Sequence, residues 1–125
     1  MFVKKIKLKT IKNTKGSLTV FEKLKDLNFS VKRIYYIYNN KKSKRGFHLN
    51  KKTKHFYICL NGSCKIKFFY KKKIKIFNLK NKNYGIFVKN NVWREIHCLR
   101  KNTILIALCS HKFDKKDYIY KNIYF

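Results

Sequence analysis

Apolar and charged residues alternate along much of this chain, and this period of two constrains its fold more than any other feature of the sequence. In the run 64–69, cysteine, isoleucine and phenylalanine take the even positions, while lysine takes positions 65 and 67. Successive side chains of a β-strand point to opposite faces of a sheet. The pattern therefore predicts strands with one buried face and one solvated face.

Short runs of this kind recur about every ten residues, which is the spacing of all-β sandwiches and barrels. They predict strands at 31–38, 56–60, 63–69, 74–79, 84–89, 95–99, 103–109 and 118–125. Only the segment 18–27 competes as a helix. No linker, repeat or low-complexity insert divides the chain, so we expect residues 1–125 to form a single all-β domain, with a jelly roll as its form.

The pair Asn61-Gly62 separates two of the predicted strands. Asn-Gly readily adopts the positive φ values of a type I′ turn, so 56–60 and 63–69 are expected to pair as a hairpin. In such a hairpin Cys59 lies opposite Cys64, and a disulfide between them is geometrically feasible. The alternative is two reduced thiols in the core, which a reducing cytoplasm favours.

The residues at the amino end indicate the cellular compartment in which the protein is expected. Lysines occupy positions 4, 5 and 7, and residues 1–8 lack the apolar run of a secretory signal. No span approaches the roughly 18 uncharged apolar residues of a transmembrane helix. We therefore expect a cytoplasmic protein with no membrane partner.

The charge balance is extreme, with 33 Lys and Arg against 5 Asp and Glu and a formal net charge of +28. Such a surplus points to an anionic partner. A disordered basic tail is excluded because 45% of the residues are hydrophobic. Arginine, which reads phosphates and bases through its bidentate fork, is scarce. The four arginines are Arg33, Arg45, Arg94 and Arg100. We infer that much of the lysine charge is compositional and lies on solvated faces.

Several motifs occur in the same order as in a known protein family. They read FSVKRIYYIY at 29–38, KRGFH at 44–48, LNGSC at 60–64, WRE at 93–95 and DYI at 117–119. Together they resemble the sugar-nucleotide 3,4-ketoisomerases, WxcM-like cupins that act on dTDP-4-keto-6-deoxyglucose, over about residues 15–125. The resemblance implies a metal-free cupin jelly-roll barrel, a homodimer with exchanged amino-terminal strands, and a place in deoxysugar biosynthesis for surface polysaccharide.

The implied reaction needs a base, a proton donor and hydrogen-bond donors, but no cofactor. A base removes the C3 proton of the 4-keto sugar, and a proton returned to C4 leaves the ketone at C3. We expect His48 to be that base, with Gly46, His48 and Asn50 on one strand face that lines the barrel. The family pattern is His-Ala-His, whereas this chain reads His48-Leu49-Asn50. Asn50 can hold a substrate oxygen by hydrogen bonds but cannot transfer a proton.

The remaining candidates for substrate contact are cationic or aromatic. Arg94 stands where many relatives have histidine, and the resemblance links that arginine to a gluco-configured 3-keto product. Lys15 occupies another position where relatives differ with product stereochemistry. Arg33 and Tyr35 lie two apart on one predicted strand, so they are expected to face the same cavity and contact the diphosphate and a sugar hydroxyl or the thymine. Arg45 is a further candidate, with a plain loop cation as its alternative.

A metal centre is not expected. Other cupins hold a metal through two histidines, a glutamate and a later histidine, but here the second histidine is Asn50 and the glutamate position is Lys54. His55 is expected to face the opposite side from Lys54 and so not to substitute for it. His97 and Cys98 are adjacent on a predicted strand, so they should not form a catalytic dyad.

Three functions remain open. The first is an active 3,4-ketoisomerase, and the second is a catalytically impaired cupin that binds a sugar nucleotide, because Asn50 and Arg94 depart from the common pattern. The third is a basic β-barrel that binds nucleic acid or another polyanion, with tyrosine and phenylalanine rings stacking on bases. The third explains the charge but leaves the ordered motifs unexplained.

Overall fold

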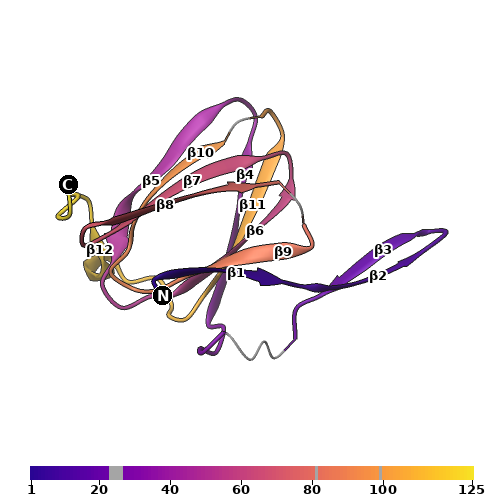
Figure 1. Cartoon of the computed structure of the whole chain (residues 1–125), viewed down its shortest axis with the longest axis horizontal. Coiled ribbons are helices and arrows are strands. Elements are labelled where there is room, and N and C mark those ends of the chain that lie inside the picture. Colours follow the sequence, from indigo (N-terminus) through magenta and orange to yellow (C-terminus); the bar gives the residue numbers. More distant parts are fainter. Residues whose placement is uncertain (23–26, 81, 99) are drawn as a thin grey trace.

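Two five-stranded antiparallel sheets face each other and enclose the core (Figure 1). The computed structural model describes residues 1–22, 27–80, 82–98 and 100–125. The first sheet contains, in order, β1 (Val3–Lys7), β9 (Tyr84–Val88), β6 (His55–Asn61), β11 (Thr103–Cys109) and β4 (Arg33–Asn39). The second contains β12 (Tyr118–Ile119), β5 (Ser43–Asn50), β10 (Trp93–Cys98), β7 (Cys64–Tyr70) and β8 (Lys73–Leu79). A separate hairpin joins β2 (Lys9–Asn13) to β3 (Gly16–Val20).

The strand order is that of a double-sheet jelly roll. From β4 to β11 the chain crosses repeatedly between the sheets, and β4, β11, β6 and β9 lie side by side opposite β5, β10, β7 and β8. The described residues contain no α-helix, only the short 3-10 turn η1 (Lys115–Asp117). No helix that could cross a membrane is therefore present among the described residues. The all-β class is confirmed, while the two sheets of the described chain are not joined by backbone pairing into one closed barrel.

The buried core consists of the residues that the alternating pattern predicted. In β7, Cys64, Ile66 and Phe68 are fully buried, while Lys65 and Lys67 lie on the other face. The buried residues meet the inner face of the first sheet, where Tyr57 and Leu105 are also fully buried. Burial of these apolar side chains, rather than any disulfide, holds the two sheets together.

The outer face of the first sheet carries a second apolar cluster. Phe56 and Phe87 contribute aromatic rings there, and Phe21, Leu27 and Phe29 pack over them from the segment before β4. The rings of Phe21 and Phe56 lie 5.2 Å apart, and those of Phe29 and Phe87 lie 6.3 Å apart. Because both faces of this part of the sheet are covered, β9 is buried along its whole length rather than alternating.

The second sheet ends at β8, whose outer edge pairs with no strand of the described chain. Ile74 and Ile76 on this strand are 49% and 51% exposed, and the exposed lysines Lys73 and Lys75 alternate with them. This edge is therefore both apolar and strongly cationic.

The predicted hairpin around Asn61-Gly62 is wrong. β6 pairs with β9 and β11, whereas β7 pairs with β8 and β10, so the chain crosses between the sheets here. Gly62 alone of the two has a positive φ, at 76°. A Cβ atom on Gly62 would lie 2.9 Å from Cβ of Thr103. The motif thus marks a tight corner, which needs the same backbone freedom as a hairpin turn.

The same correction removes the basis for the predicted disulfide between Cys59 and Cys64. Cys59 and Cys64 lie in different sheets, and all four cysteines are free thiols. The sulfur of Cys59 lies 3.2 Å from the Asn61 carbonyl oxygen. The sulfur of Cys64 lies 3.5 Å from that of Cys98, its partner across β7 and β10. A Cys59–Cys64 disulfide is therefore absent.

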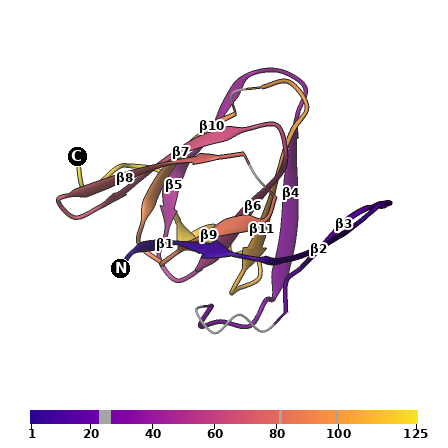
Figure 2. The same cartoon turned by 45° about the vertical axis from the view of Figure 1, so that its right-hand side comes forward.

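The ends of the chain differ most from expectation. The strands β1, β2 and β3 were not predicted, and residues 18–20 of the proposed helix 18–27 belong to β3, while 23–26 lie outside the described residues. The predicted strand 95–99 ends at Leu99, which also lies outside them. The predicted strand 118–125 contains only β12. The β2–β3 hairpin projects from the sheets, and Figure 2 shows this from a second side.

Close packing over β9 gives a test of the fold. A Cβ atom on Gly85 would clash with the ring of Phe56 and lie 2.7 Å from the carbonyl oxygen of Tyr57. We expect Gly85→Ala to lower the free energy of unfolding by about 1–3 kcal/mol, as overpacking typically does. Urea unfolding measures this. Lys72→Ala, in the exposed β7–β8 turn, is the control and should change stability by less than about 0.5 kcal/mol.

Candidate functional site

Two rows of side chains cross the inner face of the first sheet through β4, β11 and β6. The residues in register are Arg33, Cys109 and His55 in one row and Tyr35, Ala107 and Tyr57 in the next. Arg33 and Tyr35 therefore share a face, as their spacing predicted. Ala107 separates the two tyrosines of its row with a small side chain.

A β-bulge in β5 arranges the opposite sheet. His48 pairs with Arg94 on β10, but Gly46 pairs with the next residue, Glu95, so Phe47 is an extra residue. The φ values of Gly46 and Phe47 are 86° and 55°. The bulge does not turn Gly46 to the other face, because a Cβ atom on Gly46 would lie 3.3 Å from Cγ of Arg94 and 3.5 Å from Cγ1 of Ile96, which both point inward. Gly46 therefore shares a face with His48 and Asn50, as expected, and the extra residue Phe47 is turned outward, toward His97.

Arg94 is fully buried between the sheets. Its Nη1 donates to the Tyr57 hydroxyl at 2.8 Å, its Nη2 donates to the Val92 carbonyl at 3.0 Å, and its Nε has no partner. The ion pair found among the described residues joins Lys52 and Asp114, not Arg94. Burying a cation without an anion costs several kcal/mol, so this guanidinium favours an anionic group bound beside it.

His48 lies on the inner face next to Arg94 and is half-buried. Its Nδ1 is 3.1 Å from the Gly46 carbonyl oxygen, and its ring centre is 4.9 Å from that of Tyr118. Burial, reinforced by the charge of Arg94, lowers the pKa of His48 to about 4. The ring is therefore neutral at pH 7, and with Nδ1–H donating to Gly46, Nε2 is left as a proton acceptor.

Asn50 is held by a buried carboxylate. Its Nδ2 donates to Asp117 at 3.0 Å, and Asp117 also accepts from the Thr53 hydroxyl and, at 2.7 Å, from the Lys52 backbone N–H. Burial raises the pKa of Asp117, but these hydrogen bonds outweigh burial and leave that pKa below its ordinary value. The Oδ1 atom of Asn50 is buried without a partner, so it is an acceptor still to be satisfied.

Arg33 lies among aromatic rings. Its Nη1 donates to the Tyr118 hydroxyl at 3.3 Å, and its Cζ lies 4.8 Å from the ring centre of Tyr35 and 5.2 Å from that of Phe113. Burial raises the pKa of Tyr35 well above its ordinary value, so this phenol stays protonated. Tyr118 contacts both Arg33 and His48 and so connects the two sheets at this end.

Two predicted residues do not join this group within the chain. Arg45 is exposed, and its Nε donates to Asn39 at 3.0 Å, at the opposite end of β4 from Arg33. Lys15 is exposed in the turn of the β2–β3 hairpin, which projects from the sheets (Figure 1). Its backbone N–H donates to the Asn13 side chain at 2.8 Å.

The inner face contains two residues, His55 and Tyr57, that the sequence reasoning did not place in the site. His55 and Tyr57 point inward from β6, whereas the Lys54 ammonium contacts Asn28 at 3.3 Å. Lys54 and His55 do face opposite sides, but the assumption that Lys54 takes the interior position was wrong. Residues 55–59 are buried on both faces of β6, so its sequence shows no alternation that could have indicated which face points inward. The described residues hold no group of three or more His, Cys, Asp or Glu side chains that could bind a metal ion.

Comparison with known proteins places this geometry in a family. The family model described as FdtA, WxcM-like, C-terminal matches residues 1–125. The chain belongs to the FdtA WxcM-like family. It is 37% identical over 117 residues to a TDP-4-oxo-6-deoxy-α-D-glucose-3,4-oxoisomerase of Aneurinibacillus thermoaerophilus, which covers 93% of this chain and 84% of the relative.

Solved structures of ketoisomerases resemble this FdtA-family chain closely. QdtA, a sugar 3,4-ketoisomerase from Thermoanaerobacterium thermosaccharolyticum in complex with TDP, is 37% identical with a TM-score of 0.89, over 96% of this chain and 88% of QdtA. WlaRB, a TDP-quinovose 3,4-ketoisomerase from Campylobacter jejuni, is 30% identical with a TM-score of 0.89, over 95% of this chain and 92% of WlaRB.

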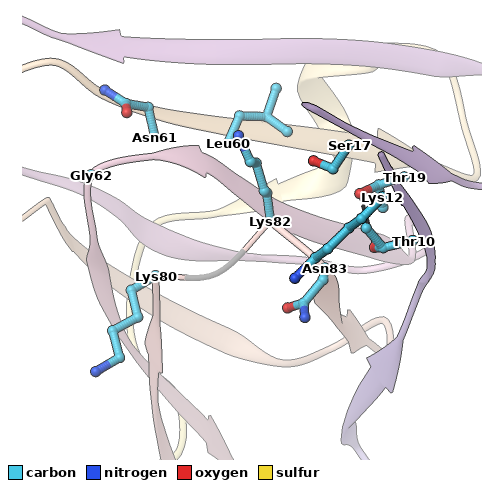
Figure 3. Close-up of a pocket in the computed structure, with 10 residues that line it drawn as sticks. All are labelled: Thr10, Lys12, Ser17, Thr19, Leu60, Asn61, Gly62, Lys80, Lys82 and Asn83. Atoms are coloured by element: carbon cyan, nitrogen blue, oxygen red, sulfur yellow. Dashed lines mark hydrogen bonds between the residues drawn. The ribbon is translucent and has the colours of Figure 1, made fainter. Parts of the chain in front are cut away.

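A separate cavity of about 510 Å³ lies between the β2–β3 hairpin and the corner after β6 (Figure 3). Its lining residues are Thr10, Lys12, Ser17, Thr19, Leu60, Asn61, Gly62, Lys80, Lys82 and Asn83. It contains none of the predicted site residues and no histidine or carboxylate. The cavity therefore offers lysines and hydroxyl groups but no acid–base chemistry near neutral pH.

The depressed pKa of His48 predicts how stability depends on pH. The unfolded chain binds a proton at His48 below about pH 6.5, whereas the folded protein binds it only near pH 4. The contribution of His48 to stability is therefore complete above pH 6.5 and is lost toward pH 4, at about 1.4 kcal/mol per pH unit. When the free energy of unfolding is measured with urea at several pH values in that window, it should depend less steeply on pH in His48→Gln than in the wild type, by the equivalent of about one proton. Equal slopes would contradict a neutral, buried His48.

Proposed function

We propose that this protein, acting as a single domain of residues 1–125, is a TDP-sugar 3,4-ketoisomerase that converts TDP-4-keto-6-deoxyglucose to a TDP-3-keto-6-deoxyhexose. The observation that carries the proposal is that a neutral His48 on β5 lies in register with Arg94 on β10, a buried cation with no anionic partner among the described residues. A base beside a cation is what the removal of a proton next to a carbonyl requires. Relatives named as ketoisomerases support the substrate class.

In this mechanism Nε2 of His48 takes the proton from C3 of the sugar. The negative charge passes to the oxygen at C4, giving an enediolate. Arg94 stabilises that charge through its guanidinium, whose Nε has no partner within the protein. His48 then returns its proton to C4, while the hydroxyl proton of O3 is transferred to O4, and the carbonyl forms at C3. No electrons enter or leave, so the residues of the chain suffice.

The remaining inward residues fit the parts of a nucleotide sugar. Arg33, held by Tyr118, faces the diphosphate, and Tyr35 contacts a sugar hydroxyl or the thymine. The free Oδ1 of Asn50 accepts a hydrogen bond from a sugar hydroxyl, because Asp117 already engages its amide group. Arg94 would favour the gluco-configured product, as the resemblance implies.

We further propose a cytoplasmic homodimer with exchanged β2–β3 hairpins, serving deoxysugar biosynthesis for surface polysaccharide. The hairpin exposes Ile11 at 50% and Leu18 at 61%. The outer face of β4 exposes Ile34, Tyr36 and Tyr38 at 62%, 70% and 53%. Apolar area of this kind on a projecting arm and on a sheet face favours association between copies. Exchange would carry Lys15 toward the partner's site.

Incubation with TDP-4-keto-6-deoxyglucose in deuterated buffer tests the activity. We expect NMR to show a 3-keto product with deuterium at C4, because the proton that His48 returns exchanges with solvent. His48→Asn should lower the rate at least about 10²-fold, the usual contribution of a positioned base. His97→Asn is the matched control, since His97 lies on the outer face of β10, near Phe47.

The outcomes separate the other candidate functions. TDP binding without product or exchange would contradict the isomerase and support the impaired sugar-nucleotide binder. Binding of nucleic acid that weakens steeply with added salt, without binding of TDP, would support the polyanion-binding barrel.

Mixing two defective variants tests the exchanged hairpin. Lys15→Glu reverses the charge of a residue that exchange would carry toward the anionic substrate in the partner's site, so this variant and His48→Asn should each have low activity. When the two are unfolded, mixed and refolded together, heterodimers regain one site with His48 from one chain and Lys15 from the other. We expect activity well above the sum of the separate proteins. Activity equal to that sum would exclude a shared site.

A further inference from the structure

A second histidine lies inside the molecule without an assigned role. His55 extends from β6, is 1% exposed and has a buried Nδ1 atom with no hydrogen-bond partner. Its ring lies nearly parallel to that of Tyr57, with 5.4 Å between ring centres and 13° between planes. An unpaired buried polar atom costs stability, so the site is incomplete as it stands.

The surroundings of His55 keep its imidazole neutral. Burial is the main cause that lowers its pKa well below the ordinary value, and the positive charges of Arg94 and Arg33 act in the same direction, as does His48 when it is protonated. These charges come from β10, β5 and β4, so His55 lies among the residues of the proposed site. Tyr57, on which its ring is stacked, accepts the hydrogen bond from Arg94.

The proposed isomerisation needs one more proton-transfer group. The C3–H and O3–H bonds break, the C4–H and O4–H bonds form, and the carbonyl moves from C4 to C3. His48 accounts for the hydrogen that moves between the carbons. The hydroxyl proton must move from O3 to O4, and the amide of Asn50 cannot transfer it.

We propose that His55 is this second proton-transfer residue, which gives a proton to O4 as the enediol forms and regains one from O3 as it breaks down. The inference rests on the proposed function. A neutral imidazole acting on the oxygens of an enediolate is a known solution in isomerases. His55 thus replaces, from β6, the proton-transfer capacity that position 50 on β5 lacks.

The test separates carbon exchange from isomerisation. The full-length wild type, His55→Gln and His48→Asn are incubated with TDP-4-keto-6-deoxyglucose in deuterated buffer, and NMR follows deuterium at C3 of the substrate and the formation of product. Glutamine can form hydrogen bonds but cannot transfer a proton. We expect His55→Gln to lose at least about 10²-fold in product formation. Exchange at C3 should fall much less, so the ratio of exchange to product rises at least tenfold. His48→Asn should lose both.

Controls guard against a merely structural effect. His97→Gln should keep the wild-type rates, and calorimetry with TDP should give the same affinity for His55→Gln as for the wild type. If His55→Gln does not fold, His55→Asn is measured in the same way. An unchanged rate of product formation, or an equal loss of exchange and product, would overturn the role of His55. A wild type that forms no product would overturn the proposed function itself.

Discussion

Arg94 reaches from β10 across the interior to the hydroxyl of Tyr57 on β6, and this hydrogen bond spans the two sheets at the end where the polar residues gather. Gly46, in the β5 bulge, lets the backbone of β5 pack closely against that of β10 at Arg94, because a Cβ atom on Gly46 would lie 3.0 Å from the Arg94 carbonyl oxygen. Burial is the main cause of the low pKa values of His48 and His55, and the charge of Arg94 lowers both further. The burial of Arg94 therefore links the packing of the sheets to the protonation state of the site.

Much of the fold could be predicted from the alternation of side chains, because a half-buried strand is required to show it. The run 64–69 gave both the strand and its buried face correctly. The corner at Gly62 could not be distinguished from a hairpin, since both need a positive φ and the difference lies in which distant strands pair. The strands β2 and β3 were missed because they are largely exposed, and β1 was missed because its buried residues, Val3 and Ile6, are three apart and do not alternate.

The candidate site could be predicted only where regular spacing holds. Arg33 and Tyr35 share a face because β4 is regular between them. Arg45 lies on the far side of the bulge from His48, and its side chain contacts Asn39 instead. The inward direction of His55 depends on its register with Cys109 in β11, which a single strand does not contain. Pairing and contact with distant strands, rather than local pattern, decided these positions.

The edge strand β8 gives the lysine-rich composition a physical consequence for solubility. Ile74 and Ile76 are exposed beside backbone groups that face no further strand of the described chain, which is the arrangement that promotes edge-to-edge aggregation. Lys73 and Lys75 alternate with them, so a second copy that paired with this edge would bring like charges together. The lysines thus act as gatekeepers against pairing at this edge, and because salt screens like-charge repulsion, this protection weakens as ionic strength rises.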